Sequence, residues 1–124
     1  MNATRENTNL GTIDCVSDSR IMPTAKEVEI VATYLKAGHT YILNAYFNLN
    51  TTNPGEIMQG KLQVVAGETT GINSDYARTT AAGGGGVFVT AIVKAMADTQ
   101  INAVGFTTVS GASMTALITK VRIK

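Results

Sequence analysis

The first stretch that could carry chemistry is AAGGGGVFVTAIVK, in which Gly83–Gly86 precede a run of apolar residues. Consecutive glycines can turn their backbone N–H groups toward a phosphate. A P-loop, however, needs spaced glycines followed by Lys and Ser or Thr at the start of a helix. Here a β-branched run follows, and the next lysine is Lys94. A tight turn at positive φ, or close packing that side chains would prevent, explains the glycines better.

His39 and Cys15 are the single histidine and the single cysteine of the chain. A catalytic or metal-binding histidine needs partners, and nothing in the sequence places carboxylates near His39. Cys15 has no cysteine or histidine at ligand spacing and cannot form an intrachain disulfide. We therefore interpret His39 as a turn residue and Cys15 as a structural or incidental thiol.

Acidic residues offer a second route to a metal site. Asp14 with Asp18, or Asp75 with Asp98, could be considered as calcium ligands. Neither pair belongs to a loop of alternating oxygen ligands, which is the pattern that calcium sites show. No nucleophile is paired with a base either. We predict a protein that is not an enzyme and has no catalytic, cofactor-binding or metal site.

The composition of the 124 residues bounds the function further. One domain is expected at this length. The net charge of +1 and the 15% of charged residues argue against nucleic-acid binding. No apolar run approaches the roughly 20 residues of a membrane helix, so no membrane insertion is expected. Because ordinary domains carry about 25% charge, this surface, rich in Thr, Asn, Gly and Ala, predicts an assembly subunit.

A period of two recurs along most of the chain and predicts β-strands. In the first strand Val28, Ile30, Ala32 and Tyr34 share one face. The clearest strand spans Tyr41–Leu49, and further runs cover Ile57–Ala66, Val87–Met96, Ile101–Val109 and Met114–Ile123. We predict an all-β, antiparallel jelly-roll sandwich over residues 23–124, preceded by a polar arm over residues 1–22 with a short strand at Thr12–Val16. A helix over Thr90–Met96 is the alternative for one segment.

Three segments resemble a known family. LKAGHTYILNAYFNLN resembles a strand of the tumour-necrosis-factor-like and complement-head-like jelly rolls, and GVFVTAIVKAMADTQINAVGFT is similar to their later hairpin. SMTALITKVRIK is similar to their closing strand. The resemblance covers Val28–Lys124, and similar endings occur in bacteriophage virion proteins. It implies a compact homotrimer, whose interface we expect to include Tyr46, Phe88, Ile92, Phe106, Met114, Ala116 and Ile118.

The first functional hypothesis is a bacteriophage virion protein, made in the host cytoplasm. More narrowly, it is a trimeric capsid decoration (cement) protein that binds the major capsid protein or another virion protein. The expected docking arm includes Asn9, Leu10 and Ile13.

A receptor-binding tip module of a phage tail or head fibre is the alternative. Its partner would be a host-surface receptor or glycan, bound by exposed loops that contain Asn53, Gly55 and Gly84. The start of the sequence is polar and shows no stalk-like repeat, which favours the first hypothesis. A lyase or isomerase on a cupin-like jelly roll is a third reading, which a single histidine opposes because such sites need several metal ligands.

Overall fold

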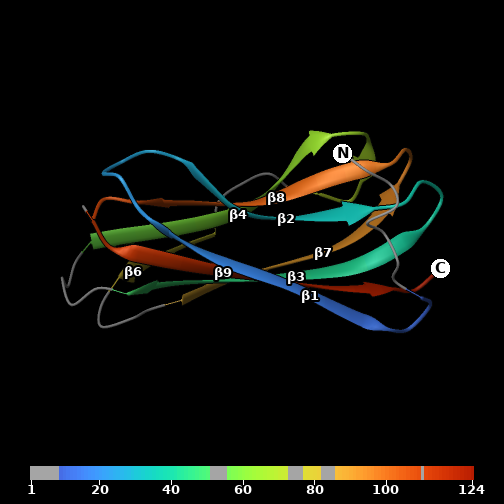
Figure 1. The fold of residues 1–124 in the computed structure, drawn as a ribbon, viewed down its shortest axis with the longest axis horizontal. Coiled ribbons are helices and arrows are strands. Elements are labelled where there is room, and N and C mark those ends of the chain that lie inside the picture. The colour runs from blue at the N-terminus through green and yellow to red at the C-terminus, as the bar shows by residue number, and fades with distance from the viewer. Residues whose placement is uncertain (1–8, 51–55, 73–76, 82–85, 110) are drawn as a thin grey trace.

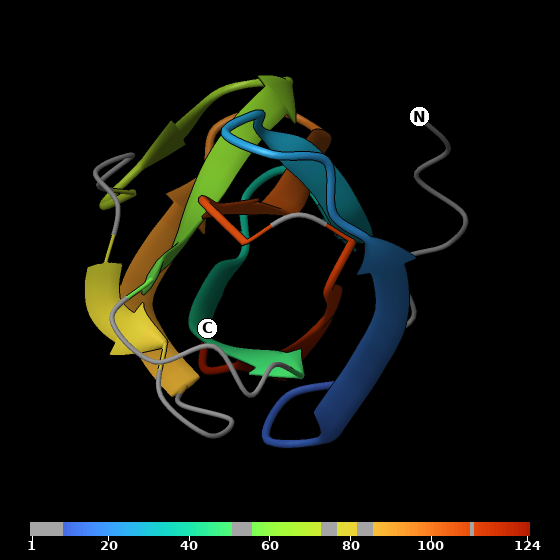
Figure 2. The same ribbon diagram turned by 90° about the vertical axis from the view of Figure 1, so that its left-hand side faces the viewer.

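The computed structural model describes residues 9–50, 56–72, 77–81, 86–109 and 111–124, which form nine β-strands. In chain order these are β1 (Ile13–Ile21), β2 (Val28–Leu35), β3 (Thr40–Asn50), β4 (Glu56–Ala66), β5 (Thr69–Thr70), β6 (Ala77–Ala81), β7 (Gly86–Ala95), β8 (Thr99–Thr107) and β9 (Ser113–Arg122). The larger sheet has the order β1-β9-β3-β7-β5, and the smaller sheet has the order β2-β8-β4-β6. Both are antiparallel and pack face to face as a sandwich (Figure 1), whose two layers enclose the core when viewed from one end (Figure 2).

The chain alternates between the two sheets. All odd-numbered strands, including the two-residue β5, belong to the larger sheet, and all even-numbered strands belong to the smaller one. Each connection between consecutive strands therefore crosses from one sheet to the other, and the predicted all-β antiparallel sandwich is confirmed. The helix alternative over Thr90–Met96 is wrong, because Thr90–Ala95 continue β7, where Thr90, Ala91, Ile92, Val93 and Lys94 pair with β3.

β3 lies at the centre of the larger sheet and pairs with β7 on one side and β9 on the other. Its inward side chains are completely buried, as the period-two pattern predicts: Tyr41, Leu43, Ala45, Phe47 and Leu49. A Cβ atom at Gly60 of β4 would overlap the aromatic ring of Phe47. The ring therefore lies directly on the backbone of the opposite sheet, and the bare glycine makes this contact possible.

A β-bulge in β2 overturns part of the sequence-based assignment of faces. The pairing with β8 shifts between Glu29 and Val31, so that Ile30 is an extra residue. An extra residue reverses which side chains point inward beyond it. Ile30 is buried as predicted, but after the bulge Thr33 and Leu35 are the buried residues, rather than Ala32 and Tyr34. Alternation alone could not reveal this, because both faces of β2 carry apolar residues.

The predicted arm over residues 1–22 is also corrected in part. Residues Ile13–Ile21 form β1, an edge strand that pairs with β9 along its whole length. Met22 is 1% exposed and belongs to the core. The strand is thus longer than the predicted Thr12–Val16 segment. Its sequence is too polar to predict a strand, but pairing with β9 supplies the backbone hydrogen bonds that extend it.

A buried lysine connects the two layers. Lys120 of β9 is 2% exposed, and its Nζ donates a hydrogen bond of 2.7 Å to the backbone oxygen of Tyr34 in β2. Asp14 of β1 lies 3.7 Å from the same Nζ, and the centre of the Tyr41 ring lies 5.8 Å away. The ammonium group is therefore shared by strands of both sheets, and its stem fills the space between them.

Replacing Gly60 by alanine should destabilise the fold by about 1–3 kcal/mol, because the new methyl group would displace the Phe47 ring. Urea unfolding of the variant measures this. The double variant Gly60→Ala/Phe47→Leu is the control. Its loss should be smaller than the sum of the two single losses by about 1 kcal/mol. Additive losses would contradict the contact.

Lys120→Ala should lower the free energy of unfolding by about 3 kcal/mol, because it removes both the buried stem and the ammonium group. Lys120→Met keeps most of the stem, so its loss should be near 1 kcal/mol. The exposed Lys94 on β7 provides the matched control, and Lys94→Met should leave the urea midpoint almost unchanged. Equal losses at the two positions would show that Lys120 does not connect the sheets.

Candidate functional site

The outer face of the larger sheet is the most distinctive surface of the described chain. Paired residues of β1, β9, β3 and β7 form rows that cross the sheet. One row is aliphatic: Ile13, Val121, Ile42 and Ile92. The next row is polar but uncharged: Cys15, Thr119, Asn44 and Thr90.

Two further rows continue the pattern toward the other end of the strands. The third row is Ser17, Leu117, Tyr46 and Phe88. The fourth row is Ser19, Thr115, Asn48 and Gly86. The sixteen positions of these four rows contain no Asp, Glu, Lys or Arg, so we call this surface the uncharged face. Three of its apolar members are highly accessible: Ile13 is 65% exposed, Phe88 is 71% exposed and Ile92 is 62% exposed. Ile42, Leu117 and Val121 are half-buried.

Aromatic packing organises one side of the uncharged face. The rings of Tyr46 and Phe88 lie 4.6 Å apart between centroids, at 38° to each other. The Tyr46 ring also covers Gly86, where a Cβ atom would collide with it. Gly86 is the last residue of the glycine run, and it supports the close-packing interpretation at this position. The other three glycines of the run lie outside the described residues.

The outer face of the smaller sheet has a different character. Glu29 of β2 and Lys61 of β4 both flank Val104 of β8, and Lys61 forms an ion pair of 2.7 Å with Glu27. Val104 is only 2% exposed although it points away from the core, so its polar neighbours cover it. Asn102 on the same face is also buried. Charged neighbours therefore cover Val104 on this surface, although Val65 of the same sheet is 48% exposed. On the uncharged face, the exposed apolar side chains have no charged residue in their rows.

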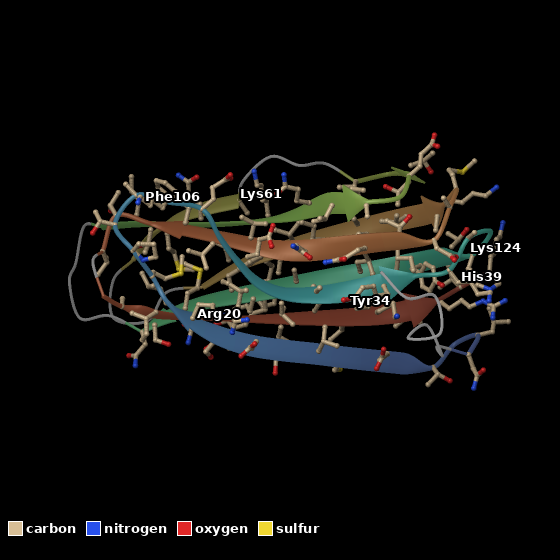
Figure 3. All side chains as sticks on the ribbon, turned by 45° about the horizontal axis from the view of Figure 1, so that its top comes forward. Arg20, Tyr34, His39, Lys61, Phe106 and Lys124 are labelled. Carbon is tan, nitrogen blue, oxygen red and sulfur yellow. The ribbon has the colours of Figure 1, made fainter. Side chains whose placement is uncertain are left out.

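The structure divides the seven predicted interface residues into three groups. Tyr46, Phe88 and Ile92 come together on the uncharged face. Phe106 lies on the outer side of the smaller sheet, next to Gln59, and Figure 3 shows it near the opposite end of the sandwich from His39 and Lys124. The remaining three, Met114, Ala116 and Ile118, lie in the core. Four of the seven residues therefore do not belong to the uncharged face.

The three residues of β9 are a correction. Met114, Ala116 and Ile118 are at most 1% exposed and lie in the core of the chain itself. They pair with the inward residues Leu49, Phe47 and Ala45 of β3, which fixes their direction. The outward residues of β9 are instead Leu117, Thr119 and Val121, which the sequence reading missed. Both phases of this strand contain apolar residues, and pairing with β3 shows which phase points inward.

Sequence reasoning also missed Ile42, although a signal was present. Ile42 alternates with the buried side of β3 and follows Thr40, in phase with Asn44 and Tyr46. One isoleucine on an otherwise polar face carries little weight in a linear pattern. Only the register places it between Val121 and Ile92, where it completes an aliphatic row.

One residue of the predicted docking arm, Ile13, belongs to the uncharged face. Asn9 and Leu10 are exposed and precede β1, and Leu10 forms a β-bridge with Arg122. Ile13 is the first residue of β1 and contributes to the aliphatic row. The predicted loop residues Asn53, Gly55 and Gly84 lie outside the described residues.

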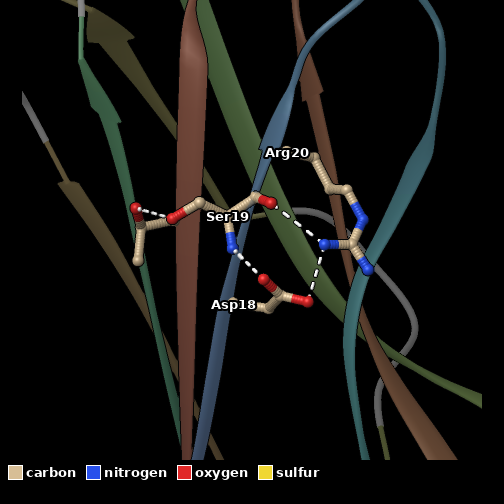
Figure 4. Close-up of polar contacts among 4 residues, drawn as sticks. Asp18, Ser19 and Arg20 are labelled. Carbon is tan, nitrogen blue, oxygen red and sulfur yellow. Dashed lines mark hydrogen bonds and ion pairs between the residues drawn. The ribbon is translucent and has the colours of Figure 1, made fainter.

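A polar cluster marks the far end of β1 (Figure 4). The Asp18 carboxylate accepts a hydrogen bond of 2.6 Å from the Arg20 guanidinium and one of 2.8 Å from the backbone N–H of Ser19. These two bonds, that of Arg20 first, hold the pKa of Asp18 below its ordinary value of 3.8. The Ser19 hydroxyl lies 2.7 Å from that of Thr115 on the uncharged face.

The single histidine and the remaining candidates lie apart. His39 is in the turn between β2 and β3, edge-on to Tyr41 at 6.4 Å between ring centroids. Cys15 is a free, exposed thiol in the second row of the uncharged face. Asp98 accepts a hydrogen bond from the backbone N–H of Ala37. Over the described ranges we find no pocket, no group of three His, Cys, Asp or Glu that could hold a metal, and no helix able to span a membrane.

The structure thus defines the class as an antiparallel β-sandwich whose larger sheet carries four adjacent uncharged rows on its outer side. No protein-family model matches the chain, and no curated protein matches it by sequence. In fold the chain is similar to one in the structure of the infectious bursal disease virus Gx strain, at a TM-score of 0.53 and 11% identity. That match covers 92% of this chain and 34% of the viral one.

Two further structures of that virus match with lower scores. One is the VP2 subviral particle of infectious bursal disease virus, at a TM-score of 0.49 and 10% identity, with coverage of 94% of this chain and 34% of that one. The other is the virus Gt strain, at a TM-score of 0.45 and 12% identity, with coverage of 93% and 34%. This chain therefore spans 34% of the length of the matched chain in each of these three structures. At such identities the likeness shows the fold alone.

Arg20→Gln should raise the pKa of Asp18 toward 3.8, because it removes the strongest hydrogen bond to the carboxylate. In the wild type the pKa of Asp18 is lower in the folded chain than in the unfolded one, so its ionised carboxylate stabilises the fold at pH values above 3.8. This contribution disappears as the pH falls through the lowered value. Carboxyl-detected NMR titration of both proteins measures the change.

Ser19→Ala is the matched control for this titration. It removes the hydroxyl that meets Thr115 but keeps the backbone N–H that bonds Asp18, so the Asp18 titration should not move. An Asp18 pKa that is the same in the wild type and in Arg20→Gln would show that the ion pair does not form in solution.

Proposed function

We propose that this chain is a structural protein of a virion. More narrowly, we propose a bacteriophage decoration protein that sits as a homotrimer on the capsid and binds the major capsid protein or another virion protein. The observation that carries the proposal is the unequal treatment of the two outer faces. The smaller sheet covers Val104 with Glu29 and an ion pair, whereas four adjacent rows of the larger sheet expose apolar side chains without any charge among them.

A surface of the second kind is typical of an interaction site, because clusters of exposed apolar side chains bordered by polar residues mark sites where proteins associate. The sandwich fold, shared with a chain from a virus structure, supports a role in a shell. The polar contacts described above serve to hold strands and turns together, which favours a structural role over catalysis.

Light scattering of the purified protein tests the homotrimer. The expected mass is three times the 13.0 kDa of one chain at micromolar concentration. A mass of 13.0 kDa throughout would contradict the homotrimer.

The virion role needs a separate test on particles. Electron microscopy of particles assembled with and without this protein should show regular knobs on the capsid that disappear when the protein is left out. Full particles with an unchanged shell, but with lost adsorption to host cells, would instead support the receptor-binding alternative and contradict the decoration role.

A further inference from the structure

We propose that the uncharged face is the surface through which copies of this chain contact one another. The inference rests on the proposed homotrimer, and it specifies the surface through which the three copies bind one another. The partner that binds the uncharged face is therefore a second copy of this chain.

Charge is the first reason. Around a rotation axis, identical residues of neighbouring copies approach each other, so any Lys, Arg, Asp or Glu near the axis meets its own kind and is repelled. The four rows of the uncharged face contain none of these residues. Their polar members are mainly Thr, Ser and Asn, each of which has both a donor and an acceptor and can bond to its own copy. A partner of strong charge would find nothing on this face to pair with.

The competing surfaces are less suitable. The free edge of β1 could accept another strand, but Asp18 and Arg20 lie on the side of β1 opposite the uncharged face. They form an exposed ion pair there. Charges on that side of an edge strand are a common obstacle to strand addition. The outer face of the smaller sheet already covers Val104 beneath Glu29 and the Glu27–Lys61 pair, so a copy docking there would have to desolvate charges.

The size of the uncharged face fits an ordinary interface. Four strands about 4.8 Å apart, each contributing seven residues of about 3.4 Å from the first row to the last, give a surface of roughly 19 by 24 Å. A stable contact buries about 800 Å² of accessible surface on each partner, which a corrugated surface of these dimensions can supply. The most exposed side chains, Phe88, Ile92 and Ile13, lie near its two lateral borders, where neighbouring copies would first touch.

Cys15 allows a test without altering the wild-type sequence. Its thiol is the only one in the chain and belongs to the uncharged face. We expect its rate of reaction with Ellman's reagent to fall at least about tenfold as the protein concentration rises through the association range. The control is Cys15→Ser/Val65→Cys, which moves the thiol to an exposed position on β4, outside this face. Its rate should not depend on concentration.

A pair of charge insertions provides the second arm. Ile92→Glu places a carboxylate on the uncharged face, and Val65→Glu places one at a similarly accessible position elsewhere. Ile92→Glu should weaken association at least about a hundredfold in sedimentation equilibrium, whereas Val65→Glu should leave it unchanged. Circular dichroism and the urea midpoint verify that both variants fold.

The outcomes separate this inference from the proposed function. A homotrimer in which Cys15 stays reactive and Ile92→Glu still associates would overturn the inference and leave the homotrimer standing. A wild type that remains a monomer at every concentration would overturn both the inference and the homotrimer. The role in a virion would still be decided by the particle experiment. If Ile92→Glu failed to fold, the Cys15 measurement on the wild type alone would decide.

Discussion

The contact between Phe47 and the bare backbone at Gly60 sets the separation on which the rest of the sandwich depends. The ring projects from the central strand of the larger sheet onto β4 of the smaller one. Because the two layers approach so closely here, the inward side chains of β3 and its neighbours can fill the interior without residual exposure. Lys120 makes the second connection, from β9 to β2, with a hydrogen bond in place of apolar packing.

This interior determines the outer surfaces indirectly. Since every strand alternates, fixing one set of side chains inside places the other set outside. The larger sheet then exposes rows of Ile, Leu, Tyr and Phe separated by rows of Thr, Asn and Ser, with no charge among them. The smaller sheet instead covers Val104 with charged and amide neighbours. The contrast between the faces, rather than any cluster of reactive groups in the described chain, is the basis for the proposed role in an assembly.

Much of this could be predicted from the sequence. Tyr41–Leu49 alternates cleanly between apolar and polar residues, and its buried face is confirmed at every position. The apolar excess of the strand after the glycine run is real, since Phe88 and Ile92 remain open in the single chain. The failures share one cause. In β2 and β9 each phase mixes apolar with polar residues, so alternation alone does not settle which side is inside, and a bulge or a pairing partner decides.

The sequence by itself determined that the chain forms many short strands, that it carries little charge, and that one strand has more apolar surface than a single core can use. Those properties depend on local periodicity and composition. Only the tertiary structure decided that β1 belongs to the sheet, that Met114, Ala116 and Ile118 point inward, and that Ile13, Ile42, Val121 and Ile92 form one row. The physical reason is that rows across a sheet are made by register between distant segments, and no single segment contains that information.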